Sequence, residues 1–214
     1  MTDWDERFRT GDYPSDPEPS RVLREYVGDT RDGRALDIAC GTGRNALFLA
    51  EQGYEVDALD RSLEGLRITG ANAAERDVDD RIDLIQADAT RFAYPVEYYD
   101  VVTISFFPTL ERLSDIKTAL RPDGLLFYQH HLRSDPSAAT GPSEDRQRFC
   151  SNELLGTCLD LTVLYYEESG EQWHGDYSAT VELVARISDG CTQSYPETRW
   201  SADASQSSKP NVKP

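Results

Sequence analysis

The strongest constraint on the fold is the regular alternation of strand-like and helix-like segments along the middle of the chain. Short apolar segments rich in β-branched residues, which predict strands, are separated by amphipathic segments of helical period. The five strands expected there cover residues 35–39, 54–59, 81–87, 101–106 and 125–130. Because strands joined through helices pair in parallel with right-handed crossovers, this pattern predicts a doubly wound, Rossmann-like α/β sheet.

The helices between these strands have recognisable start and stop signals. Ser20 and Ser62 each precede an amphipathic segment and are expected to be N-caps. Further helices are expected over residues 44–52 and 110–120. The second of these should stop at the Arg-Pro-Asp-Gly turn of residues 121–124, before the fifth strand begins.

The end of the chain follows a different pattern. A helix is expected near residues 152–158, followed by strands over 161–167 and 178–187. The short connection between these strands contains Gly170 and Gly175, which predicts an antiparallel hairpin. We therefore divide the chain into an N-terminal segment (1–19), one α/β domain (20–188) and a polar, disordered tail (189–214).

The charge of the chain restricts its partners. The sequence has 39 acidic and 22 basic residues, a formal net charge of −17, and only three lysines. Such a surface suits concentrated salt, in which self-repulsion is screened, and favours a halophilic source over an ordinary acidic protein. The same surface should repel a nucleic-acid backbone. A small molecule is therefore the expected partner, and the chain is expected to be a monomer or homodimer.

The terminal and cysteine patterns indicate a cytoplasmic protein. The first residues have neither a basic start nor an apolar run, and no segment approaches the length of a membrane span. The four cysteines are far apart and form no Cys-x-x-Cys pair. With only three histidines and no ligand-like spacing, no metal site is expected.

A glycine loop, Gly41-Thr42-Gly43, lies between the first predicted strand and the following helix. With Ala46 it matches the dinucleotide fingerprint, which taken alone is a weak signal. Asp37 inside the first strand fits a sulfonium or ammonium ligand better than a pyrophosphate. Asp60 and Asp88, at the ends of the next two strands, could accept from ribose hydroxyls and an adenine amino group. Any one aspartate alone could simply cap a helix, but the three together favour a ligand site.

The segment Leu36-Asp37-Ile38-Ala39-Cys40-Gly41-Thr42-Gly43-Arg44-Asn45-Ala46 resembles the first motif of class I S-adenosylmethionine-dependent methyltransferases, closest to the small tellurite-resistance branch. The resemblance continues through Val56–Asp60, Gln86–Ala89, Tyr99–Val102 and Leu120–Gly124. It implies a seven-stranded sheet with an antiparallel last strand, and S-adenosylmethionine as cofactor. The cofactor-binding residues that it implies are Asp37, Ala39 (where many members have glycine), Gly41, Gly43, Asn45, Asp60, Arg61, Asp88, Ala89 and Ser105.

The sequence restricts the methyl acceptor less than the cofactor. Ser105-Phe106-Phe107-Pro108, after the fourth strand, lacks the Asn/Asp-Pro-Pro-aromatic sequence of amide and exocyclic-nitrogen methyltransferases, and the acidic residue of aminopropyltransferases. We expect a small-molecule acceptor, and assign no catalytic residue. Residues that either line its pocket or only pack in the core are Trp4, Tyr13, Phe106, Phe107 and His131. Trp4 and Tyr13, with Arg7 and Phe8, resemble a lid over the cofactor. An NAD-dependent dehydrogenase and a non-catalytic cofactor-binding protein are the alternatives.

Overall fold

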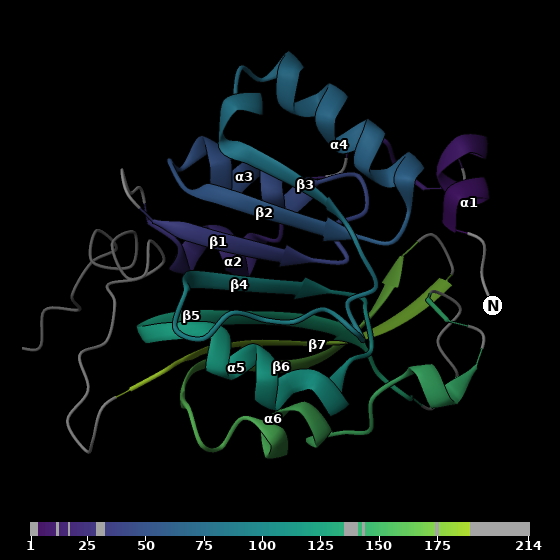
Figure 1. Ribbon diagram of the computed structural model, residues 1–214. Coiled ribbons are helices and arrows are strands. Elements are labelled where there is room, and N and C mark those ends of the chain that lie inside the picture. The colour runs from purple at the N-terminus through teal and green to yellow at the C-terminus, as the bar shows by residue number, and fades with distance from the viewer. Residues whose placement is uncertain are drawn as a thin grey trace, which may run out of the picture.

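A single seven-stranded sheet forms the centre of the protein (Figure 1). The computed structural model describes residues 4–11, 13–16, 18–28, 33–134, 141–142, 144–173 and 176–188. The strand order is β3-β2-β1-β4-β5-β7-β6. The strands are β1 (Arg34–Ile38), β2 (Glu55–Asp60), β3 (Ile82–Gln86), β4 (Tyr99–Ser105), β5 (Leu120–His131), β6 (Thr162–Trp173) and β7 (Asp176–Arg186). β1 to β5 pair in parallel, whereas β7 is antiparallel to both β5 and β6. The expected fold class is confirmed.

Helices cover both faces of the sheet (Figure 1). They are α1 (Trp4–Thr10), α2 (Arg21–Tyr26), α3 (Arg44–Glu51), α4 (Leu63–Glu75), α5 (Leu113–Ala119) and α6 (Glu153–Thr157), with single 3₁₀ turns at η1 (Asp79–Arg81), η2 (Leu110–Arg112) and η3 (Asp145–Gln147). α2, α3 and α4 lie on one face, and α5 and α6 on the other. α1 contacts α4 beside the edge at which the parallel strands end. None of the described helices is long and apolar enough to cross a membrane.

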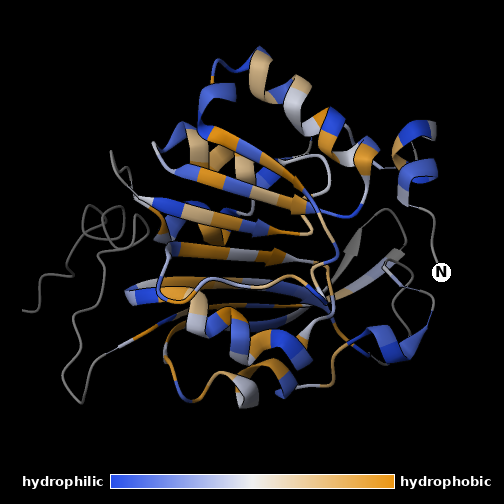
Figure 2. Ribbon diagram, viewed as in Figure 1, coloured by the Kyte–Doolittle hydropathy of each residue, from blue (hydrophilic) through white to orange (hydrophobic). Residues whose placement is uncertain are grey.

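The core consists of one apolar cluster on each face of the sheet. The inner strands are largely hydrophobic, whereas α4 and α5 mix polar and apolar residues (Figure 2). Phe127 of β5 belongs to the cluster under α2 and α3, and Tyr128 to the cluster under α5. Since side chains alternate along a strand, Gln129 and His131 share the face of Phe127, and His130 shares that of Tyr128. His130 and His131 therefore point to opposite faces of the sheet.

Both expected serine caps are confirmed. The Ser20 hydroxyl accepts a hydrogen bond from the Leu23 N–H at 3.4 Å, and the Ser62 hydroxyl accepts one from the Gly65 N–H at 3.1 Å. α3 also ends where expected, followed by Gly53 with φ +95°. Side-chain caps and glycines act within one turn of the chain, which is why the sequence locates them well.

The turn at residues 121–124 does not separate α5 from β5 as predicted. β5 already begins at Leu120, which pairs with Tyr99, and the turn is an irregularity within the strand. The Asp123 N–H donates to Ile187 at 3.1 Å, and the Ile187 N–H donates to Gly124 at 3.0 Å. The turn is thus stabilised by the end of β7, a partner more than 60 residues away. The helix expected over 110–120 is correspondingly divided into η2 and α5.

Two further differences concern the ends of the domain. The β6–β7 hairpin is longer than predicted, because Gly170 pairs with Ala179 inside the ladder instead of lying in the connection. Gly175 and the tail 189–214 lie outside the described residues. α1, by contrast, was not expected as a helix. It has only seven residues and is stabilised by packing on α4. No local sequence pattern predicts this packing.

Candidate functional site

The loop between β1 and α3 depends on its glycines. Gly41 and Gly43 have φ angles of +60° and +89°, the left-handed region that glycine adopts without strain. A Cβ on Gly43 would lie 2.7 Å from Cγ2 of Thr69. Ala39 also has a positive φ, +56°, which is a conformation that glycine, the residue expected there from the family resemblance, adopts without strain. The loop therefore brings bare backbone to the N-terminal end of α3.

Asp37 is buried beneath this loop. Its Oδ1 accepts from the Thr103 hydroxyl at 2.7 Å, and its Oδ2 accepts from the Ala46 N–H at 3.0 Å. Burial raises the pKa of its carboxyl group to about 6, against the opposing effects of the Thr103 hydrogen bond and the charge of Arg44. Both oxygens are thus directed at β4 and the first turn of α3, so Asp37 fixes where α3 begins.

Asp60, the last residue of β2, joins the loop to α4. Its Oδ2 accepts from the Gly41 N–H and its Oδ1 from the Ser62 N–H, both at 2.8 Å. Burial raises the pKa of this carboxyl group. Each carboxylate oxygen has a second lone pair, so Asp60 retains the capacity to accept from two ligand hydroxyls.

Asp88 follows β3 by two residues and, unlike Asp60, is exposed. Its Oδ1 accepts from the N–H and hydroxyl of Thr90 at 2.9 and 2.7 Å, and these bonds lower the pKa of the carboxyl group. No partner of Oδ2 is found among the described residues, so this oxygen can accept from a ligand. A hydrogen bond of 2.9 Å from the Ala87 N–H to the Asp60 carbonyl ties the two strand ends together. Nearby, Ala89 is buried and Arg61 is exposed.

Asn45 connects the glycine loop to the end of β4. Its Nδ2 donates to the hydroxyl of Ser105 at 2.9 Å, and its Oδ1 accepts from the Ser20 N–H at 3.4 Å. Asn45 is almost completely buried. The predicted cofactor residues Asn45 and Ser105 therefore lie side by side although 60 residues separate them.

The N-terminal segment covers the glycine loop, and its central residue is Phe8, which is buried. The Phe8 ring lies 3.5 Å from the position that a Cβ on Gly41 would take. Trp4 and Tyr13 pack around this ring, with centroid distances of 5.7 and 5.4 Å, and the Arg7 guanidinium lies 4.8 Å from the centroid of Trp4. Trp4 and Tyr13 thus contact Phe8, the residue that covers the glycine loop.

Asp5 holds this cover in place, a role that the sequence did not reveal. Its Oδ1 accepts from the Ser62 hydroxyl at 2.5 Å and from the Glu64 N–H at 3.1 Å. These hydrogen bonds lower the pKa of the Asp5 carboxyl group. An acidic residue in a polar N-terminal segment has no distinctive pattern, so only the contact with α4 identifies it.

The two phenylalanines after β4 differ. Phe107 packs against the core cluster under α5. Phe106 has φ +56° and stacks on His131 at 4.5 Å, with the Arg44 guanidinium 5.3 Å from its centroid. Arg44 also donates to the side chain of Gln129 at 2.7 Å. Phe106 and His131 therefore form an aromatic pair beside the glycine loop.

Several buried polar atoms at the ends of β4 and β5 have no hydrogen-bond partner within the described part of the chain. They are Thr109 Oγ1, His130 Nδ1 and His131 Nδ1. His130 Nε2 lies 2.8 Å from the carbonyl of Gln147, so the proton is assigned to this nitrogen and Nδ1 is left as an acceptor. Burial lowers the pKa of both histidines to about 4, so both are neutral at pH 7. Unpaired buried polar groups are costly and often mark ligand sites.

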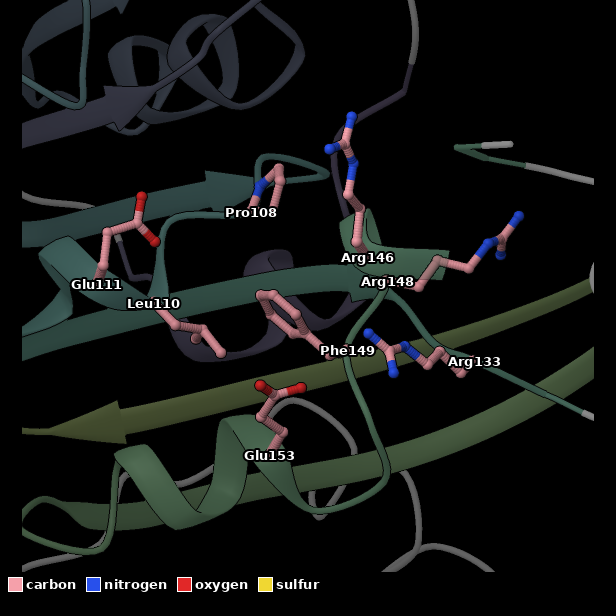
Figure 3. Close-up of a pocket in the computed structure, with 8 residues that line it drawn as sticks. All are labelled: Pro108, Leu110, Glu111, Arg133, Arg146, Arg148, Phe149 and Glu153. Carbon is pink, nitrogen blue, oxygen red and sulfur yellow. The ribbon is translucent and has the colours of Figure 1, made fainter. Parts of the chain in front are cut away.

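A pocket of about 280 Å³ lies next to two of these residues (Figure 3), because its lining includes Pro108 and Leu110, which flank Thr109, and Phe149, whose ring lies 4.2 Å from that of His130. It is lined by Pro108, Leu110, Glu111, Arg133, Arg146, Arg148, Phe149 and Glu153. Of these, only Pro108 belongs to the segment that the sequence singled out. Among the described residues, no group of three or more His, Cys, Asp and Glu side chains could hold a metal ion.

Comparisons with known proteins agree with this geometry. Residues 35–124 match the family model of the methyltransferase domain. A ubiquinone/menaquinone biosynthesis C-methyltransferase of Azotobacter vinelandii is 35% identical over 177 residues, which cover 77% of this chain and 69% of that protein. The chain belongs to the S-adenosylmethionine-dependent methyltransferases. The cofactor of this family, S-adenosylmethionine, is the one that the resemblance of the segment around the glycine loop implied.

Other relatives are matched over a shorter part. A demethylmenaquinone methyltransferase of Renibacterium salmoninarum is 37% identical over 100 residues, 47% of this chain and only 39% of that protein. The crystal structure of TehB from Haemophilus influenzae has a TM-score of 0.62 at 20% identity, covering 72% of this chain and 57% of that one. This structural likeness shows the shared fold.

Proposed function

We propose that this chain transfers the methyl group of S-adenosylmethionine to a small-molecule acceptor by in-line displacement. The observation that carries the proposal is the hydrogen bond from the Gly41 N–H to Asp60, which joins the glycine loop to a carboxylate suited to a ribose. Family membership supports it, because the named relatives are methyltransferases acting in quinone biosynthesis.

In this proposal the chain contributes binding and orientation. S-adenosylmethionine, when bound, supplies an electrophilic methyl group on a sulfonium. Asp60 would accept from the ribose hydroxyls and Asp88 Oδ2 from the adenine amino group, while Gly41 and Gly43 would hold the methionine part. Asp37 orients the first turn of α3. The Phe8 cover excludes water from the loop, which strengthens the electrostatic interactions inside.

Calorimetry with S-adenosylmethionine, followed by a homocysteine-release screen over thiols, halides, chalcogen oxyanions, amines and carboxylates, tests the function. We expect binding, and turnover with at least one acceptor. No binding at millimolar cofactor would contradict the proposal. Binding without turnover would favour the non-catalytic alternative, and tight NADH binding the dehydrogenase.

The N-terminal segment is proposed as a lid. α1 is fastened to α4 through Asp5, and Phe8 contacts the glycine loop directly. Removing residues 1–14 should therefore weaken cofactor binding and lower turnover. Unchanged affinity and turnover in the shortened protein would refute the lid.

We further propose that the protein is cytoplasmic and halophilic, does not bind nucleic acid and is a monomer or homodimer. Its acidic composition supports the halophilic source and the lack of nucleic-acid binding. The net charge of −17 should make the protein repel itself at low salt. A melting temperature that rises steadily with salt is expected, and one that does not rise would count against a halophilic source.

A further inference from the structure

The pocket beyond β4 and β5 contains charged groups to which the proposed function gives no role. Three of its eight lining residues are arginines, in a chain with only 22 basic residues and a net charge of −17. Pro108 follows β4 by three residues, and Arg133 follows β5 by two. The pocket therefore lies at the edge of the sheet at which the cofactor residues are also found.

Arg133 is the arginine that faces the interior of this pocket. Its guanidinium extends toward Phe149 and Glu153, whereas Arg146 and Arg148 extend away from them (Figure 3). Its Nε donates to the Asp145 carbonyl at 2.8 Å, which fixes the plane of the group. In the part of the chain that the structure describes, neither terminal nitrogen of Arg133 has a hydrogen-bond or ion-pair partner. Such a fork fits a planar carboxylate.

The other two arginines have structural roles. The buried Arg148 donates to the carbonyls of Pro142 and Leu132, at 3.0 and 3.4 Å. The exposed Arg146 forms an ion pair with Glu144. Arg148 thus holds the segment around η3 and Arg146 already has an ion-pair partner, so Arg133, which is also exposed, is the cation on which ligand binding should depend.

Two carboxylates limit the charge that the pocket can accept. Glu153 Oε2 accepts from the Cys150 N–H at 2.7 Å, and Glu111 lies farther along the wall. Within the described ranges, no ion pair joins Arg133 to either of them. One guanidinium facing these carboxylates favours a single negative charge over two. Phe149 and Leu110 supply an apolar wall between the charges.

We propose that this pocket binds a small monocarboxylic acid with a flat apolar body, and that the methyl acceptor belongs to this class. The assignment of the methyl acceptor to this class rests on the proposed methyl transfer. Arg133 binds the carboxylate through its two terminal nitrogens, and Phe149 and Leu110 contact the body. The glutamates reject dianions such as phosphate monoesters.

Calorimetry with benzoate, phenyl phosphate and benzyl alcohol, each added to the protein saturated with S-adenosylhomocysteine, tests the pocket. We expect benzoate to bind more tightly than either of the others. Arg133→Gln should weaken benzoate binding tenfold or more, with Arg133→Lys in between, because lysine keeps the charge but not the fork. Glu153→Gln should tighten benzoate binding severalfold and admit phenyl phosphate.

Arg67→Gln is the matched control, because Arg67 is an exposed arginine on α4, paired with Glu64. It should bind benzoate like the wild type. Equal binding by the Arg133→Gln and Arg67→Gln variants, or equal affinity for benzoate and benzyl alcohol, would overturn the proposal. Phenyl phosphate binding more tightly than benzoate would overturn its limit to one charge.

The failure of the proposed function would look different. Absent binding of S-adenosylhomocysteine to the wild type would refute the proposed function, whereas a benzoate titration of the cofactor-free protein would still test Arg133. Conversely, turnover of neutral acceptors alone, unaffected by Arg133→Gln, would leave methyl transfer intact and overturn the carboxylate acceptor.

Discussion

The ends of β1 to β3 and the ends of β4 and β5 lie along one edge of the sheet but satisfy their polar groups differently. We call the first region, with Asp37 and Asp60, the cofactor side, and the second, with Thr109, His130 and His131, the acceptor side. On the cofactor side, all four carboxylate oxygens of the buried Asp37 and Asp60 accept hydrogen bonds from the protein. On the acceptor side, each of the three residues has a buried polar atom without a partner in the described part of the chain.

The pairing of buried polar groups thus distinguishes the two regions. A site whose polar groups are already paired by the protein is preorganised, so its ligand can bind without rearrangement. Unpaired buried groups cost stability, and a ligand that pairs them recovers that cost. We infer that the cofactor side is rigid, whereas the acceptor side retains a cost in stability at these unpaired atoms.

The largest effect that would separate the two sides is expected from glycine replacement. Gly43→Ala should destabilise the protein by about 2–4 kcal/mol, because the residue has a positive φ and its new Cβ would meet Thr69. Gly156→Ala, in α6, should instead stabilise by up to about 1 kcal/mol, since nothing lies within 4 Å of that Cβ. Urea unfolding measures both free energies.

Thr69→Ser supplies the control for Gly43, because it removes the methyl group that the new Cβ would meet. The double variant should recover the part of the packing loss due to this methyl group, but not the part due to the backbone, and Oγ1 of residue 69 would still lie about 3.0 Å from the new Cβ. If Gly43→Ala and Gly156→Ala changed the free energy of unfolding equally, the rigidity assigned to the cofactor side would be refuted.

The next effect compares two aspartates proposed to bind the same cofactor. Asp60→Asn should cost about 1–3 kcal/mol of stability, because the amide group would face a backbone N–H that now has an acceptor. Asp88→Asn should change stability by no more than about 0.5 kcal/mol, since Asp88 is exposed and its Oδ1 can still accept from Thr90. Both should weaken cofactor binding in calorimetry. Loss of stability in Asp88→Asn but not in Asp60→Asn would contradict the assignment of the stabilising role to Asp60.

The pH dependence of stability should have opposite signs on the two sides. The pKa of Asp37 is raised to about 6 in the folded state, so its contribution to stability increases as pH falls from 6 toward 4. The pKa of His130 and of His131 is lowered to about 4, so their contribution is lost as pH falls from 6.5 to 4. These contributions partly cancel in the wild type.

Single substitutions should reveal each contribution. Asp37→Asn keeps both hydrogen bonds, because the amide can donate to Thr103 and accept from Ala46, and it should steepen the loss of stability on acidification. His131→Gln should make that loss shallower. Chemical denaturation at pH 4 to 7 measures the slopes, and identical slopes in the three proteins would contradict the pKa directions.

The smallest effect concerns two residues with the same φ of +56°. Ala39→Gly relieves strain on the cofactor side, offset by greater freedom of the unfolded chain, and should stabilise by less than about 1 kcal/mol. Phe106→Gly relieves the same strain but loses the contacts with His131 and Arg44, so its stability should fall. Thermal unfolding compares the pair, and destabilisation by Ala39→Gly would show that the loop requires alanine.

The sequence by itself determined the doubly wound sheet, its hairpin and the glycine loop. The periods of strands and helices, serine caps and glycine turns act over a few residues, so they can be read locally. The places of Asp37 inside a strand and of Asp60 at the end of the next strand were also read locally, whereas their role in cofactor binding stays a prediction.

Only the tertiary structure decided what depends on distant partners. β5 begins at Leu120 because Ile187 satisfies the turn that follows, and α1 is a helix because Phe8 packs against α4. The contact of Asp5 with Ser62 and the place of Arg133 in the pocket beside Phe149 have no sequence signature. Such contacts join residues tens of positions apart, and nothing in the local pattern encodes which of them will meet.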